Sequence, residues 1–101
     1  MDSADKRLMM VEKLQKHKDL CQKLNDTYTQ KNSDYGDSFS QTFNALGLIS
    51  AITRISDKYN RVCNLALSNT AHVKDETIVD TLMDMANYCL MTVMELEERA
   101  E

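Results

Sequence analysis

Apolar residues recur at helical spacing along most of the chain. Between residues 4 and 30 they form a narrow stripe at intervals of three, four and seven, made of Val11, Leu14, Cys21, Leu24 and Tyr28. Residues three and four apart share one face of a helix, so this spacing predicts an amphipathic helix. Because the rest of the segment is polar or charged, we expect that narrow stripe to pack against one other helix.

Polar segments divide the remaining apolar pattern into two further helices. The first, KNSDYGDS at 31–38, predicts a loop in which Gly36 supplies a positive φ and Asp37 or Ser38 caps the next helix. Phe39 and Phe43 then stand on one face, and Gly47 interrupts the pattern. A strong helical period follows over 48–66, made of Leu48, Ile52, Ile55, Tyr59, Val62 and Ala66.

The second polar segment, SNTAHVKD at 68–75, also predicts a loop, with Asp75 as the N-cap of a last helix. That helix, over 76–99, has a wide apolar face, which is typical of a helix covered on more than one side. Its apolar residues are Ile78, Val79, Leu82, Met83, Met85, Ala86, Cys89, Leu90, Val93, Met94 and Leu96.

Composition narrows the fold to a single all-α domain over residues 1–101. The chain has two Gly and no Pro, whereas β-sandwiches and doubly wound α/β folds need many turn residues and glycine-rich loops. The expected architecture is three long helices plus a short one. Each long helix would measure about 36–40 Å, whereas a 100-residue globule has a radius of gyration of about 13 Å. We therefore expect a homo-oligomer with helices packed across the interface.

Charge and cysteine usage exclude several function classes. Twelve Lys and Arg against sixteen Asp and Glu give a net charge of −4, which disfavours binding to duplex nucleic acid. The sequence has no apolar run of the ~20 residues that cross a membrane, and its polar beginning is unlike a signal peptide. Three cysteines without a CxxC spacing suggest small buried side chains in a reducing cytoplasm.

Two polar stripes are candidates for a binding site. Three basic residues share one face of the predicted middle helix: Arg54, Lys58 and Arg61. Three carboxylates and an amide share one face of the last helix: Glu76, Asp80, Asp84 and Asn87. Together with Asp57, the carboxylates would hold Mg²⁺, which prefers oxygen ligands, while the basic stripe takes phosphate. Alternatively, the opposite charges pair across two packed helices. The apolar neighbours of Asp57, Asp80 and Asp84 suggest carboxylates close to the core, where charges need a partner.

Further ligand contacts are available outside these stripes. Lys31, Asn32 and Tyr35 lie in the first predicted loop. Tyr35, Tyr59 and Tyr88 are candidates for stacking on a base, with core packing as the alternative for each. His17 falls on the stripe of the first helix, where a metal role would need a partner that the sequence does not reveal. No nucleophile motif or P-loop is present.

Three blocks of the sequence resemble a known family. KNSDYGDSF, GLISAITRISDKYNR and VKDETIVDTLMDMANY are similar to the nucleotide modification associated domain of the first type, over about residues 30–95. That family consists of small all-helical proteins of phages, prophages and bacteria with Gram-positive cell walls. The resemblance implies a role around nucleotides in phage biology.

A more distant similarity is to the MazG-like all-α nucleotide pyrophosphohydrolases. Those helical oligomers hold Mg²⁺ with an EExxE motif on one helix and an ExxD motif on a later one. This sequence departs from both motifs: the middle helix has no EExxE, and Thr77 and Thr81 precede Asp80 and Asp84 by three residues where the family has Glu.

Three hypotheses follow. The first is a binder that needs no cofactor and captures a nucleotide or a cyclic nucleotide signal, with phosphate on the basic stripe, a tyrosine on the base, and Asn32 or Asn87 on polar edges. In a phage, such a binder would sequester a host defence messenger in the host cytoplasm. The second is a Mg²⁺-dependent pyrophosphohydrolase that uses Asp57, Glu76, Asp80 and Asp84. The third is a helical interaction protein with paired charges.

Overall fold

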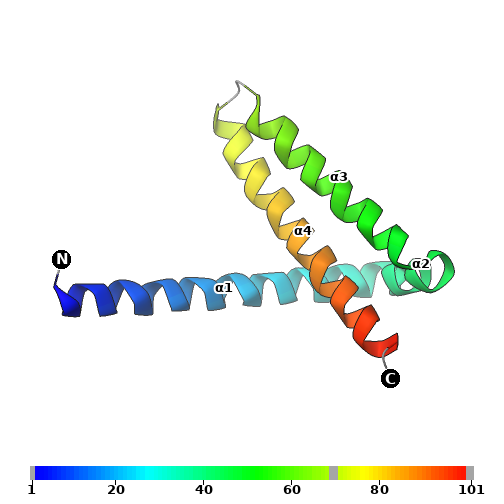
Figure 1. Ribbon diagram of the computed structural model, residues 1–101, viewed down its shortest axis with the longest axis horizontal. Coiled ribbons are helices and arrows are strands. Elements are labelled where there is room, and N and C mark those ends of the chain that lie inside the picture. The colour runs from blue at the N-terminus through cyan, green and yellow to red at the C-terminus, as the bar shows by residue number, and fades with distance from the viewer. Residues whose placement is uncertain (1, 69–70, 100–101) are drawn as a thin grey trace. The chain divides into compact units, whose positions relative to one another are not determined.

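The structure, a computed structural model, contains four helices in the part of the chain that it describes (Figure 1). It describes the backbone of residues 2–68 and 71–99, and their side chains apart from those of 71–75. The helices are α1 (Ser3–Tyr35), α2 (Ser38–Leu46), α3 (Leu48–Ala66) and α4 (Ala71–Arg99). The expected three long helices and one short helix are therefore confirmed. The chain divides into two compact units, Met1–Asp34 and Tyr35–Glu101.

The first unit is a single long helix. α1 has 33 residues and buries none of its side chains. Hydrogen bonds between residues four apart support it, from Gln15 to Asp19 and from Gln22 to Asp26. The expected loop at 31–38 is mostly wrong, because the helix continues through Lys31 and Asn32 to Tyr35. A further bond of this kind, from Gln30 to Asp34, stabilises the last turn.

A turn of two residues, Gly36 and Asp37, follows α1. Gly36 has φ 59°, which confirms the expected positive φ, and Asp37 has φ 61°. Asp37 occupies the N-cap position of α2, but its side chain makes no capping hydrogen bond. The expected capping interaction of Asp37 is therefore wrong, because its left-handed backbone differs from the extended conformation in which an N-cap side chain reaches the helix amides.

The second unit is a helical hairpin closed at one end by a short helix. α3 packs against α4 along its length, and α2 contacts both (Figure 1). Gly47, with φ 79°, separates α2 from α3. Phe39, Phe43 and Ala51 form the core of this unit, and Tyr88 and Met91 pack against it. The two phenylalanines expected to share a face are thus both buried.

Small side chains are among the most buried ones of α3 and α4. Ala51 on α3 is fully buried. Thr81 and Thr92 on α4 are only 3% and 8% exposed. Each threonine hydroxyl donates to the carbonyl four residues earlier, Thr81 to Thr77 and Thr92 to Tyr88. These threonines are therefore packed like apolar residues without an unsatisfied donor.

Three expectations, on the second loop, the N-cap of the last helix and the cysteines, are wrong. The loop at 68–75 is shorter, because α4 begins at Ala71 and Asp75 lies inside it rather than at its N-cap; residues 69–70 and the side chains of His72 and Asp75 lie outside the described parts. The cysteines are free but not buried: Cys21 and Cys89 are exposed and Cys63 is half-buried. None of the helices, over the residues described, is long and apolar enough to cross a membrane.

Candidate functional site

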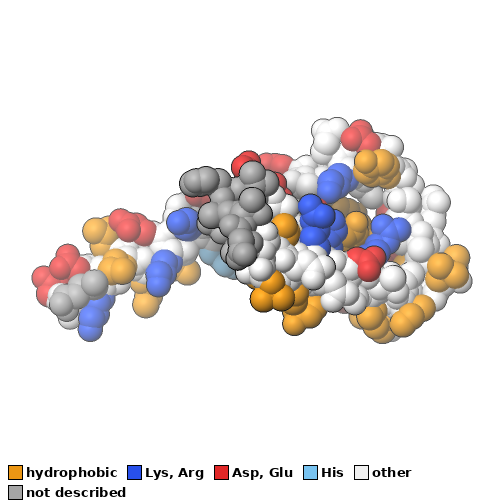
Figure 2. Space-filling view, turned by 90° about the horizontal axis from the view of Figure 1, so that it is seen from above, with side chains coloured by type: hydrophobic (Ala, Val, Ile, Leu, Met, Phe, Trp, Pro, Cys, Tyr) orange, Lys and Arg blue, Asp and Glu red, His pale blue; other side chains and the backbone are white. Residues whose placement is uncertain are grey.

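The basic stripe on α3 meets α4 over two successive turns. Arg54 lies against Tyr88, and Lys58 lies against Asp84. A step of four residues along α3 is matched by a step of four in the opposite direction along α4, as expected for an antiparallel pair. Figure 2 shows basic side chains gathered on this part of the molecule next to an acidic one.

Arg54 is held by two aromatic rings. Its guanidinium carbon lies 5.9 Å from the centroid of the Phe39 ring and 5.8 Å from that of Tyr88. The two rings are themselves stacked, with centroids 6.0 Å apart and an angle of 26° between their planes. A cation above an aromatic face is stabilised by about 0.5–2 kcal/mol, depending on its exposure. The half-buried Arg54 is therefore restrained with its planar fork in a defined place.

One basic residue and one acidic residue of the two stripes pair directly. Lys58 Nζ lies 3.3 Å from Asp84 Oδ2, and their side chains are 28% and 32% exposed. An ion pair with this exposure contributes about 0–1 kcal/mol. This contact matches the alternative in which opposite charges pair across the helices, at this one position.

The other carboxylates of the predicted metal set are solvated. Asp57, Glu76 and Asp80 are all exposed. The inference that apolar sequence neighbours place Asp57 and Asp80 close to the core is therefore wrong, because neighbours along a helix point to different faces. Within the described residues, no three His, Cys, Asp or Glu side chains are grouped so that they could hold a metal ion.

The remaining predicted contacts fall in different places. Lys31 and Asn32 belong to α1 in the first unit, whereas Tyr35 begins the second unit and is 68% exposed. Asn87 is half-buried on α4, and Arg61 is exposed on α3. Tyr88 packs against the core, which is the alternative to base stacking that the sequence left open for this residue.

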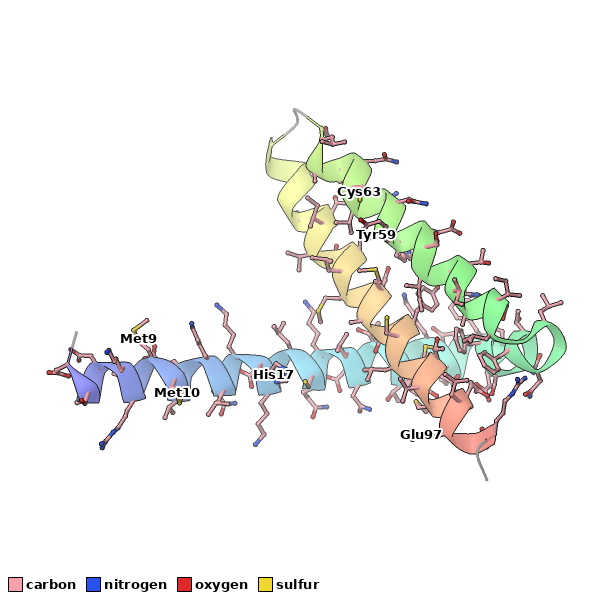
Figure 3. The ribbon with its side chains drawn as sticks, viewed as in Figure 1. Met9, Met10, His17, Tyr59, Cys63 and Glu97 are labelled. Carbon is pink, nitrogen blue, oxygen red and sulfur yellow. The ribbon has the colours of Figure 1, made fainter. Side chains whose placement is uncertain are left out.

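Tyr59 is exposed on α3, one helical turn from Cys63 (Figure 3). A hydrogen bond with the Cys63 side chain and the charge of that neighbouring group raise the pKa of the Tyr59 phenol above its ordinary value. Tyr59 therefore remains a neutral hydrogen-bonding group at neutral pH.

Phe39 is the residue of this site that the sequence analysis did not select. Its spacing placed it on one face with Phe43, but nothing in the spacing connected it to Arg54 on another helix. Two further contacts join α2 to the end of α4: the Ser40 hydroxyl donates to Glu95, and Arg99 Nη2 donates to the Phe43 carbonyl over 3.2 Å. These contacts hold α2, and with it Phe39, against α4.

Comparison with known proteins identifies the family. The family model for nucleotide modification associated domain 1 matches residues 31–96. The chain belongs to this family. Every candidate ligand and metal residue, from Lys31 to Tyr88, falls within the nucleotide modification associated domain, whereas most of α1 precedes it. No significant match was found among curated proteins or among solved structures.

Proposed function

We propose that this protein is a nucleotide-binding helical homo-oligomer that sequesters a nucleotide or a cyclic nucleotide signal. The observation that carries the proposal is the arginine–aromatic cluster of Arg54, Phe39 and Tyr88, which lies inside a nucleotide modification associated domain. A guanidinium fixed by aromatic rings offers a planar fork to a phosphate and loses little freedom on binding.

The neighbouring groups extend this cluster into a site for a phosphorylated ligand. Lys58 and Arg61 follow Arg54 along the same face of α3, so that up to three cations accompany the phosphates. Tyr88 and the half-buried Asn87 supply an aromatic surface and an amide beside them. Tyr35, which begins the second unit, is a further contact in this proposal, whereas Lys31 and Asn32 of the first unit stay predicted ligand contacts within the same family domain. We place the protein in the cytoplasm of a phage-infected cell, where such a ligand is available.

The alternative is a Mg²⁺-dependent nucleoside triphosphate pyrophosphohydrolase of MazG-like type. One experiment separates the two functions. The chain is incubated with a panel of nucleotides and cyclic nucleotides with and without Mg²⁺, then heated, and the released compounds are identified by chromatography. An intact nucleotide released by heat supports the binder, whereas a monophosphate with pyrophosphate supports the hydrolase. No retention of any nucleotide contradicts both.

Replacing Asp84 with asparagine gives opposite results for the two functions. In a binder, the change removes the carboxylate that pairs with Lys58, so the lysine is freer to meet a phosphate. We expect equal or tighter binding, with a gain of up to about 1 kcal/mol, and no effect of EDTA on the wild type. In a hydrolase, turnover would disappear in the variant and in EDTA. Calorimetry and phosphate-release assays on both proteins provide the measurement.

We further propose that the apolar surface of α3 and α4 is covered by other copies of the chain. Large apolar side chains on both helices are 43–51% exposed in one chain, among them Ile52, Val79, Leu82, Leu90, Val93 and Leu96. A surface of this kind on a helical hairpin is typical of an interface, because burying apolar area is the main driving force of association.

Light scattering should therefore give a mass that is a multiple of 11.6 kDa at micromolar concentration. A charged residue within this surface, as in Leu82→Lys, is expected to shift the mass towards that of one chain. Lysine at the exposed and polar Asn60 serves as the matched control and should leave the mass unchanged. A wild-type mass of 11.6 kDa would contradict the proposed assembly.

A further inference from the structure

The first helix carries a histidine and a cysteine that share one face. His17 lies near the middle of α1 (Figure 3), and Cys21 follows four residues later. Both side chains are exposed, and Cys21 Sγ lies 3.7 Å from His17 Nδ1. A helix places residues four apart side by side, and this spacing is used by helical metal sites that take two ligands from one helix.

The distance between these two atoms fits one metal ion. In tetrahedral zinc sites the metal lies about 2.3 Å from a thiolate sulfur and about 2.0–2.1 Å from an imidazole nitrogen. These bond lengths at a tetrahedral angle separate the two ligand atoms by about 3.5–3.6 Å. The observed 3.7 Å is therefore close to the separation that a shared zinc ion requires.

A single chain supplies only half of such a site. Structural zinc sites have four protein ligands, and the described residues of one chain bring no third His, Cys, Asp or Glu to this pair. A second copy of α1 with the same pair facing the first completes a site with two thiolates and two imidazoles. Such a set is among those that bind structural zinc in proteins.

The pattern around the pair predicts that two copies of α1 meet there. Alternating steps of four and three connect a stripe made of Met10, Leu14, His17, Cys21, Leu24 and Tyr28. This 3.5-residue repeat is the pattern of helices that pack as a coiled coil. Met10 and Leu14 are each 66% exposed, and an isolated helix in water is stabilised mainly when such a stripe is covered.

Charges beside the stripe favour an antiparallel arrangement centred between His17 and Cys21. In a parallel pair, the positions flanking the stripe would place Lys13 of each copy next to Lys18 of the other. In the antiparallel pair, the flanking positions instead bring Lys6 of each copy near Asp34 of the other, which gives two attractive contacts against a single contact between the two Lys18 residues. The antiparallel axis then passes between the two His–Cys pairs, so that all four ligand atoms surround one point.

From this geometry we infer that His17 and Cys21 of two copies of α1 form a tetrahedral site for one zinc ion. The thiols bind as thiolates and release their protons, and each imidazole binds through the nitrogen that faces Cys21. Such a zinc ion would crosslink two chains outside the family domain. This inference is independent of nucleotide binding and of the apolar surface of α3 and α4.

Titration of the metal-free full chain with zinc tests the site. We expect saturation at one ion per two chains, and cobalt in place of zinc should give the intense visible bands of a tetrahedral site with thiolate ligands. His17→Ala and Cys21→Ser should each abolish saturable binding. Both side chains are exposed, so circular dichroism should show an unchanged helix content.

Cys89→Ser provides the matched control, because Cys89 is also an exposed free cysteine but has no histidine four residues away. This variant should bind zinc like the wild type. Saturation at one ion per chain, persistence of binding in Cys21→Ser, loss of binding in Cys89→Ser, or no saturable binding by the wild type would each overturn the inference.

Discussion

Replacing Phe43 with alanine is expected to lower the free energy of unfolding by about 3–5 kcal/mol. The ring is fully buried and packs against Phe39 with centroids 6.4 Å apart. The Arg99 guanidinium carbon lies 4.5 Å from its centroid. Truncation leaves a cavity at the point where α2, α3 and α4 meet, in a unit with few other buried side chains to compensate.

Urea denaturation followed by circular dichroism measures this effect. Leu67→Ala is the control, because Leu67 is 84% exposed and its truncation should change the free energy of unfolding by less than about 0.5 kcal/mol. A similar small change for Phe43→Ala would show that the core of the second unit lies elsewhere.

Replacing Arg54 with alanine should weaken nucleotide binding by about 1.5–3 kcal/mol, the value of a hydrogen bond to a charged group. This corresponds to roughly a 10- to 150-fold higher Kd. The reason is the position of the guanidinium, which Phe39 and Tyr88 hold in place before any ligand arrives. Calorimetry with the nucleotide selected by the panel experiment provides the measurement.

Two companion variants separate binding from folding. Arg54→Lys keeps the charge but loses the planar fork, so binding should be intermediate. Arg61→Ala removes an exposed charge on the same face and should leave the melting temperature unchanged. If Arg54→Ala lowers the melting temperature while the Kd stays the same, the cluster serves the fold alone and the proposed site is wrong.

The regions that the sequence predicted well are those where one pattern dominates. A strong apolar period gave the bounds of α3 almost to the residue, and the spacing of Phe39 and Phe43 placed them on one face. The helix ends were harder, because polar residues such as Lys31 and Asn32 are compatible with both a loop and a helical turn. The helix continues through these residues and ends at Tyr35, directly before Gly36, whose positive φ is incompatible with a right-handed helix.

The site could be predicted only in part, for a similar reason. Helical spacing placed Arg54, Lys58 and Arg61 on one face, but spacing carries no information about which turn of α4 lies opposite. The pairing of Lys58 with Asp84 and the position of Arg54 between two rings depend on the register of the hairpin. The sequence also did not predict the burial of small residues on these two helices, such as Ala51 and Thr92.

The two buried threonines of α4 have a consequence for how this hairpin is aligned. Thr81 and Thr92 donate their hydroxyl protons to carbonyl groups of α4, so these hydroxyls donate no hydrogen bond to α3. Apolar contact alone would allow two helices to pack in a register shifted by one turn. The ion pair between Lys58 and Asp84 forms in only one register of the two helices and therefore favours it. Such a weak contact contributes little to the free energy of unfolding, but it lowers the population of hairpins that pack in a shifted register.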